Sequence, residues 1–274
     1  MALPTTIAST KFPARNYFLG PFLSSGGNVY VVLLNSTGND VRVFKATDPT
    51  ASFSEQDATN NPVANHAGTL WARQDGDVLS IAGGENDATP AYKFHQFDMA
   101  TDLWSTTIKD KAIASPTLQG FNGTISLVKR SDGSFVAFFN GAKEAIMGAS
   151  YERVVWSKST NGGATWTTPV AVGVTGVERN IFGALSVLGA SDRSHFFYTD
   201  TANGKHRSLS SADALDTEAA TIVTSASAGL VSGPGIAYVS GANTVVKFPI
   251  YGLSTDKFTN VYFNSGANPT INTD

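Results

Sequence analysis

The sequence has no cysteine and few charged residues, and both shortages exclude whole classes of protein. Without cysteine, the 274 residues can form neither a disulfide framework nor a thiolate metal site, so packing alone must stabilise the fold. Charged residues make up 15% of the chain, the formal net charge is -3, and no basic cluster offsets it. Domains that bind the phosphate backbone carry a basic stripe, so we expect no nucleic-acid partner.

Signals for export, membrane insertion and several kinds of catalysis are also missing. The N-terminal stretch carries Lys11 and Arg15 and no continuous apolar run, so we expect no signal peptide, no membrane insertion and synthesis in the cytoplasm. There is no Gly-x-Ser-x-Gly motif, and the four histidines have no metal-ligand spacing. We expect no cofactor and no metal. Asp and Asn on turns could hold Ca²⁺, but no Asp-x-Asp-x-Asp-Gly loop indicates a site.

The chain is rich instead in short apolar runs that alternate with Ser, Thr, Asn and Gly. Hydrophobic residues make up 42% of the sequence and there are 26 glycines, a composition typical of many strands joined by tight turns. We predict one four-stranded unit over residues 17–57 that includes strands 29–34 and 41–46, further strands at 104–108, 166–172 and 194–199, and loops into the next blade at 60–66 and 226–234. Runs that we interpret as second strands recur every 49 to 60 residues, starting at Val29, Val78, Ser134, Ser194 and Thr244. This period is that of propeller blades, whereas a β-sandwich gives no reason for a four-strand period.

We therefore predict an all-β fold, with residues 1–274 forming a single β-propeller domain of five four-stranded blades. The fourth strand of the last blade is missing or very short in the sequence pattern. Propellers commonly complete their last blade with a strand from the other terminus, which removes an exposed edge. Thr5 to Lys11 alternates polar and apolar residues and is predicted to be that N-terminal strand.

Two motifs resemble known propeller repeats. Residues 159–166 read Ser-Thr-Asn-Gly-Gly-Ala-Thr-Trp between two alternating runs, a spacing that resembles the Asp-box, or BNR repeat, of sialidase-like β-propellers. The resemblance implies structural roles for Ser159, Asn161, Gly163 and Trp166, with Asn161 where Asp is usual and Trp166 buried between blades, away from the ligand. Residues 97–104, after Gly83-Gly84, resemble a kelch blade, another propeller repeat.

The same resemblance implies that a ligand binds where the second strand of a blade passes to the third, and on the loops that lead into the next blade. Carboxylates, arginines and a tyrosine on one rim suit recognition of sugars or carboxylates. The ligand-binding candidates are Glu85, Lys143, Tyr151, Glu152, Arg153, Glu178, Arg179 and His66. Two alternatives remain open: Glu178 and Arg179 form a solvated ion pair, and His66 is a structural or exposed imidazole.

We expect first a non-catalytic propeller that binds a glycan or a protein neighbour in a larger assembly. The Arg-Ile-Pro signature of sialidases is absent, since the nearest string is Phe12-Pro13-Ala14-Arg15. A Thr-, Asn- and Gly-rich surface without an export signal is similar in style to phage or virion appendage proteins, so we expect association with a virion. The alternative is a sialidase-like or furanosidase-like glycoside hydrolase, whose two carboxyls would come from Glu144, Glu152 and Glu178.

Overall fold

The computed structural model describes fourteen stretches of the chain, to which every structural statement below refers: residues 18–34, 40–62, 66–85, 92–113, 125–141, 153–172, 185–199, 203–216, 220–224, 230–231, 236–240, 243–252, 257–264 and 272–273. All strand pairs in these stretches are antiparallel and no α-helix occurs in them, which confirms the all-β prediction. Accordingly, none of these stretches holds a helix able to span a membrane. The chain divides into a first unit, Met1–Asn122 with Asn161–Thr167, and a second unit, Gly123–Thr160 with Thr168–Asp274.

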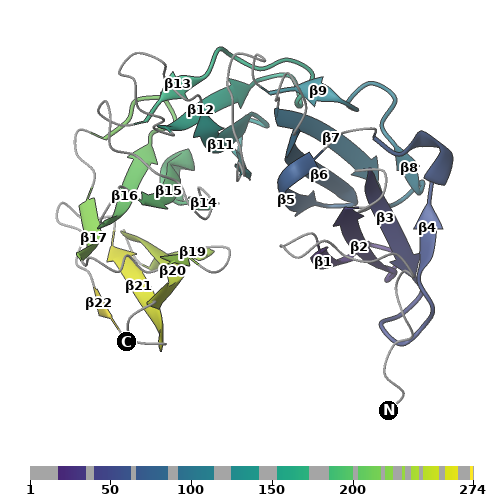
Figure 1. Cartoon of the computed structure of the whole chain (residues 1–274), viewed down its shortest axis with the longest axis horizontal. Helices are drawn as coiled ribbons and strands as arrows, with labels where there is room; N and C mark the ends of the chain where they lie inside the picture. The colour runs from purple at the N-terminus through teal and green to yellow at the C-terminus, as the bar shows by residue number, and fades with distance from the viewer. Residues whose placement is uncertain are drawn as a thin grey trace. The chain divides into compact units, whose positions relative to one another are not determined.

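The first sheet of the first unit contains four strands in sequence order (Figure 1). The strands are β1 (Phe18–Leu23), β2 (Val29–Leu34), β3 (Val41–Ala46) and β4 (Ser54–Gln56), followed by the short 3-10 helix η1 (Ala58–Asn60). The sequence predicts these strands because apolar runs are separated by turn residues, and the bounds of β2 and β3 agree with it to the residue. A single four-stranded group over residues 17–57 is confirmed.

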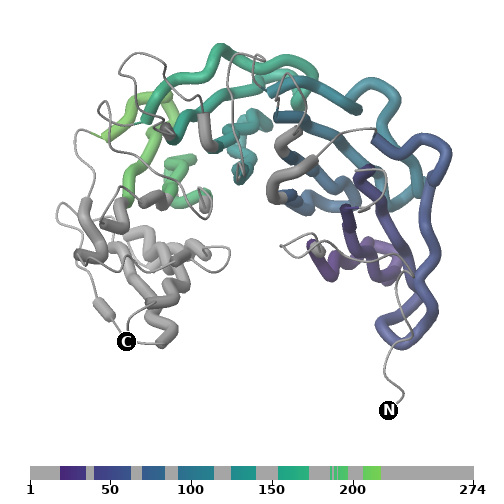
Figure 2. The backbone as a smooth tube through the Cα atoms, viewed as in Figure 1, coloured from purple at the N-terminus to yellow at the C-terminus, as the bar shows by residue number. Residues whose placement is uncertain are grey.

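The second sheet of the first unit repeats this order and adds a fifth strand (Figure 1), and Figure 2 traces the same backbone as a tube. Its strands are β5 (His66–Asp75), β6 (Val78–Glu85), β7 (Tyr92–Asp98), β8 (Leu103–Trp104) and β9 (Lys111–Ala112), and both β8 and β9 pair with β7. The predicted fourth strand, Trp104 to Ile108, is wrong in length. Ile108 N–H donates to Ser105 Oγ at 2.9 Å, which interrupts the regular pairing after Trp104, while Ser105 N–H and the Ile108 carbonyl still bond to the backbone of Gln96 in β7.

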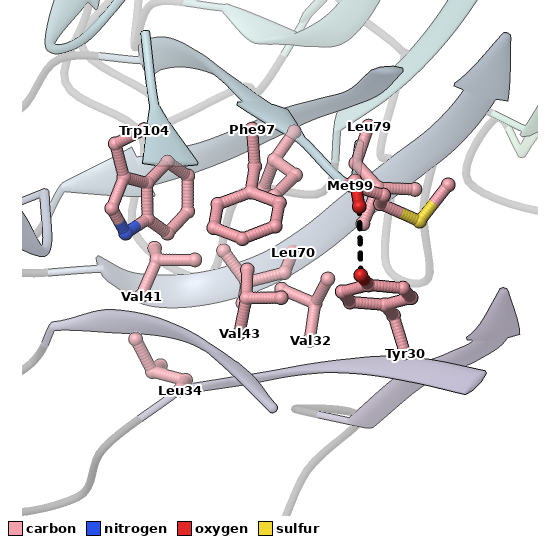
Figure 3. Packing of buried hydrophobic residues seen from close by; sticks show 11 residues of the cluster. Tyr30, Val32, Leu34, Val41, Val43, Leu70, Leu79, Phe97, Met99 and Trp104 are labelled. Carbon is pink, nitrogen blue, oxygen red and sulfur yellow. Dashed lines mark hydrogen bonds between the residues drawn. The ribbon is translucent and has the colours of Figure 1, made fainter. Parts of the chain in front are cut away.

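The core of the first unit lies between its two sheets (Figure 3). Alternate residues of β2 and β3 point into it because successive side chains of a strand face opposite sides. The buried members are Tyr30, Val32, Leu34, Val41, Val43, Leu70, Leu79, Ile81, Phe97, Met99 and Trp104. The rings of Phe97 and Trp104 meet edge to face with centroids 5.2 Å apart. This apolar layer determines which face of β5 packs in the core of the first unit, and therefore which face points away from that core.

Hydrogen bonds to aspartates join the two sheets of the first unit. Asp102, in the turn between β7 and β8 with φ of 59°, accepts from Lys45 Nζ at 2.6 Å and from Tyr30 Oη at 2.7 Å. Burial, together with the bond to Asp102, raises the pKa of Tyr30 to about 12. At the turns between first and second strands, Asp77 accepts from Ser25 N–H at 2.6 Å and from the Ser25 hydroxyl.

The second unit contains three more sheets, each again built from neighbouring strands of the sequence (Figure 1). One has β10 (Ile125–Lys129), β11 (Phe135–Gly141), β12 (Arg153–Ser159) and β13 (Val170–Ala171). The next has β14 (Leu185–Leu188), β15 (Ser194–Thr199), β16 (Asn203–Leu209) and β17 (Ala220–Thr224), with the short turn η3 (Ala190–Asp192). The last has β18 (Leu230–Val231), β19 (Ile236–Ser240), β20 (Asn243–Gly252), β21 (Lys257–Asn264) and β22 (Asn272–Thr273).

Two strand predictions in the second unit are wrong in detail. The strand expected from Trp166 to Val172 is limited to β13, and Trp166 lies outside it. The stretch Ala226 to Pro234, expected to be a loop, contains β18, which pairs with β20. Both errors concern strands of two residues, whose short apolar runs carry too little alternation to be recognised.

The same kind of junction recurs between the first two sheets of the second unit. Asp213, with φ of 62°, accepts from Arg130 Nη1 at 2.6 Å and from Lys158 Nζ at 2.9 Å. Burial raises the pKa of Asp213, but the bonds from these two cations outweigh it and hold the pKa below its ordinary value. Asp192 accepts from Ser131 N–H at 3.0 Å and from the Ser131 hydroxyl. Both units therefore join sheets by an aspartate in a turn.

Candidate functional site

The ends of the sheets at which the second strand passes to the third are called the loop ends below, and several predicted ligand-binding residues lie there. In the second sheet, β6 ends at Glu85, and Gly84 pairs with Tyr92 at the start of β7. His66 pairs with Glu85 across β5 and β6. The backbone therefore brings His66 and Glu85, which are 19 residues apart in the sequence, to the same loop end.

The position expected for His66 needs a correction. His66 was expected in the loop that leads into the second blade, whereas it is the first residue of β5. The irregular pairing between His66 and Leu70 extends β5 past its apolar run, and such bulges are not visible in a hydrophobic pattern.

Arg153 is the first residue of β12 and pairs with Gly141, the last residue of β11, so it also lies at a loop end. The six other predicted residues of this rim, Lys143, Glu144, Tyr151, Glu152, Glu178 and Arg179, lie outside the described residues. Their roles remain predictions.

The first sheet contributes a charged group at its own loop end. Arg42 lies 3.7 Å from Asp40 and 3.2 Å from Glu55, atom to atom, so one guanidinium serves two carboxylates. Asp40 immediately precedes β3 and therefore belongs to the loop end, while Glu55 lies in the outer strand β4. Within the described ranges, no three or more His, Asp or Glu side chains are grouped as a metal ion would need.

The turn over residues 159–166 has its own set of bonds. Asn161 Oδ1 accepts from Thr165 N–H at 2.9 Å, and Trp166 Nε1 donates to the Gly163 carbonyl at 3.0 Å. The Trp166 ring meets Phe94 of β7 edge to face, with centroids 5.4 Å apart. Trp166 is half-buried rather than fully buried, because its ring folds back over the turn instead of continuing into a strand.

Sequence reasoning missed two side chains with N–H donors, Trp71 and Arg73, on β5, the first strand of the second sheet. Both are half-buried, and both have a nitrogen that is buried without a hydrogen-bond partner, Nε1 of Trp71 and Nε of Arg73. Burial lowers the pKa of Arg73, and the charge of Asp75 opposes that shift. The only signal in the sequence is the order of large, small and charged residues at positions 71–73, which many strands share.

Comparisons with known proteins agree on the fold. No protein-family model matches the sequence, and no curated protein matches it. Among solved structures, an α-L-arabinanase of Penicillium chrysogenum in complex with arabinobiose is 10% identical; the match covers 94% of this chain and 92% of that chain, with a TM-score of 0.53. A thermostable family-43 glycoside hydrolase is 10% identical over 93% and 91%, with a TM-score of 0.51. A fucose-specific lectin from Aleuria aurantia is 10% identical over 90% and 73%, with a TM-score of 0.55.

At these identities the likeness shows the fold, and the propeller prediction is confirmed at that level, in preference to a β-sandwich. The expected function needs a correction. A non-catalytic binding or virion-appendage role was placed first, but two of these three similar structures are glycoside hydrolases, so the alternative is the better supported. All three handle carbohydrates, and the chain is similar to them as a β-propeller.

Proposed function

We propose that this chain is a glycoside hydrolase of furanosidase-like type that acts on arabinose-containing glycans. One observation carries the proposal: nearly the whole chain, 94%, aligns with nearly the whole of an α-L-arabinanase, 92%. The second hydrolase, matched over 93% of this chain, supports the same class of reaction.

Hydrolysis of a glycosidic bond requires two carboxyl groups on either side of it, one acting as the acid and the other as base or nucleophile. We propose Glu152 as one, because it directly precedes Arg153, whose pairing with Gly141 fixes that point of the chain at a loop end. Glu144 and Glu178 are the candidates for the second. Retention of configuration would need the carboxyls about 5 to 5.5 Å apart, and inversion about 6.5 to 9.5 Å.

We also propose that the five sheets are the blades of a single propeller domain, with Thr5 to Lys11 completing the fifth. The five sheets follow one another along the chain, and the last described strand, β22, pairs with only two residues of β21. An N-terminal strand there would cover part of that edge. Deletion of residues 1–17 should then destabilise the fifth sheet. The measurement is the hydrogen exchange of the β21 amides, which should become faster. Unchanged exchange in β21 would contradict the closure.

A panel of chromogenic aryl glycosides that includes an α-L-arabinofuranoside tests the activity. The wild-type chain should release the aglycone, and Glu152→Gln should reduce kcat by at least a hundredfold, since general acid or base catalysis contributes about 10² to 10⁴. Glu55→Gln is the matched control, because Glu55 is already paired with Arg42 in an outer strand. Equal activity of both variants would show that Glu152 is not catalytic. If the folded wild-type chain releases no aglycone, the proposal is rejected.

A further inference from the structure

The two faces of β5 have different surroundings. Leu70 and Ala72 face the first sheet, since Leu70 is in the core of the first unit and Ala72 packs against it. Trp71 and Arg73 alternate with them and therefore lie on the other face. Their partners across the sheet are small, Ala82 and Ser80 respectively, so neighbouring side chains of β6 do not cover the indole or the guanidinium.

Arg73 forms no ion pair within the described part of the chain, although the charge of Asp75 acts on it. Its Nε is buried without a hydrogen bond, as are those of Arg42 and Arg130, and Ser80 is engaged by Gln96 Nε2 at 3.4 Å. Trp71 likewise holds Nε1 buried and unbonded. The contrast with Arg42, bonded to Glu55, and Arg130, bonded to Asp213, is sharp, because the fold pairs those two cations.

A half-buried guanidinium that forms no ion pair keeps hydrogen-bond donors that can bind a ligand in place of water. The planar fork of arginine matches a carboxylate, to which it donates two parallel hydrogen bonds. An aromatic ring two residues away on the same face adds a flat surface on which the apolar face of a sugar ring can pack. Arg73 can therefore donate hydrogen bonds to an anion while Trp71 packs against a sugar ring.

We propose that Trp71 and Arg73 form a binding site for an acidic saccharide, with a uronate carboxylate on Arg73 and its ring on Trp71. The choice of a saccharide rests on the proposed function, whereas the need for an anion rests on Arg73 itself. Arg73 is seven residues from His66 along β5, roughly 23 Å of extended chain. The site is thus separate from the loop ends, and the substrate class becomes an arabinose-containing glycan that also carries uronate.

Titration calorimetry of the full chain with trigalacturonate, its methyl ester and inorganic phosphate tests the site. The wild-type chain should bind trigalacturonate at least tenfold more tightly than the neutral ester. Arg73→Gln should abolish that preference. Trp71→Ala should weaken the binding of both trigalacturonate and its methyl ester. Arg42→Gln, which removes an arginine that is already paired, should leave the preference unchanged.

The unfolding temperature separates a ligand role from a structural one. Removing an unpaired charge should leave the unfolding temperature of Arg73→Gln unchanged or raise it, and trigalacturonate should stabilise the wild type but not this variant. Lower stability of Arg73→Gln with no uronate preference in the wild type would overturn the proposal, as would phosphate binding as tightly as trigalacturonate. A chain that prefers trigalacturonate through Arg73 yet hydrolyses no glycoside would refute the proposed activity and support the site.

Discussion

Replacement of Gly163 by alanine should strongly destabilise the protein, because this glycine approaches an aromatic ring of another sheet. A methyl group at Gly163 would collide with Phe94, whose Cζ would lie at 3.0 Å and whose Cε1 and Cδ1 would lie nearer still. Phe94 cannot move freely, since it is fully buried and its ring contacts Trp166. Gly163 also has φ of 97°, which L-residues rarely adopt.

The magnitude follows from two costs. A left-handed backbone costs a non-glycine residue about 1 to 2 kcal/mol, and an extra methyl group in a packed site costs about 1 to 3 kcal/mol. Gly163→Ala should therefore lower the free energy of unfolding by about 2 to 5 kcal/mol. Gly162 is the matched control in the same turn, because its φ is 71° but a methyl group there would meet nothing within 4 Å. Gly162→Ala should cost only about 1 to 2 kcal/mol.

Urea denaturation of both variants measures the difference, with the midpoint moving and the slope unchanged. A double variant with Phe94→Leu should recover part of the loss of Gly163→Ala, because it removes the atoms that clash. Equal losses for Gly162→Ala and Gly163→Ala, or no recovery in the double variant, would refute the close approach of the turn to Phe94.

Two further predictions concern the second unit. Asp213→Ala should destabilise it by about 3 to 5 kcal/mol, because it leaves the buried Arg130 guanidinium without its carboxylate while Lys158 loses the same partner; urea denaturation would measure this, and a loss below 1 kcal/mol would contradict it. His195 and His206 are buried 3.1 Å apart, and burial lowers the pKa of His195 to about 4 and that of His206 well below 6.5. Their folded-state pKa values lie below the unfolded value, so their contribution is complete above about pH 6.5 and is lost as the pH falls toward 4, about 2 kcal/mol for His195 by pH 5. Unfolding temperatures of a His195→Gln/His206→Gln double variant should fall less steeply with acid, and parallel curves would contradict this.

The sequence predicted the strands well where burial on alternate positions was regular. β2, β3 and β15 agree with it to the residue, because each is bounded by turn residues and carries a continuous alternating or apolar run. It failed where local side-chain bonds end a strand early. Ser105 Oγ accepts a bond from Ile108 N–H, and Trp166 Nε1 donates to the Gly163 carbonyl. Both local bonds compete with regular strand pairing.

The candidate site was less accessible to sequence reasoning than the fold. His66 and Glu85 lie at the same loop end because of the register between β5 and β6. A single bulge can change that register. That Arg73 forms no ion pair with another described residue is a property of the folded chain, because several carboxylates of the sequence could have been its partner. The order of the two functional hypotheses was also wrong, because it relied on absent sequence signatures, whereas the two similar hydrolase structures favour the alternative.

The most direct test of the proposed activity is the incubation of the purified chain with an arabinan, followed by chromatography of the products. A glycoside hydrolase should produce arabinose or short arabino-oligosaccharides in an amount that rises with time, and Glu152→Gln should stop the reaction while Glu55→Gln leaves it unchanged. Binding of arabinan by a folded chain without any product would contradict the account and identify the protein as a carbohydrate-binding propeller without catalysis.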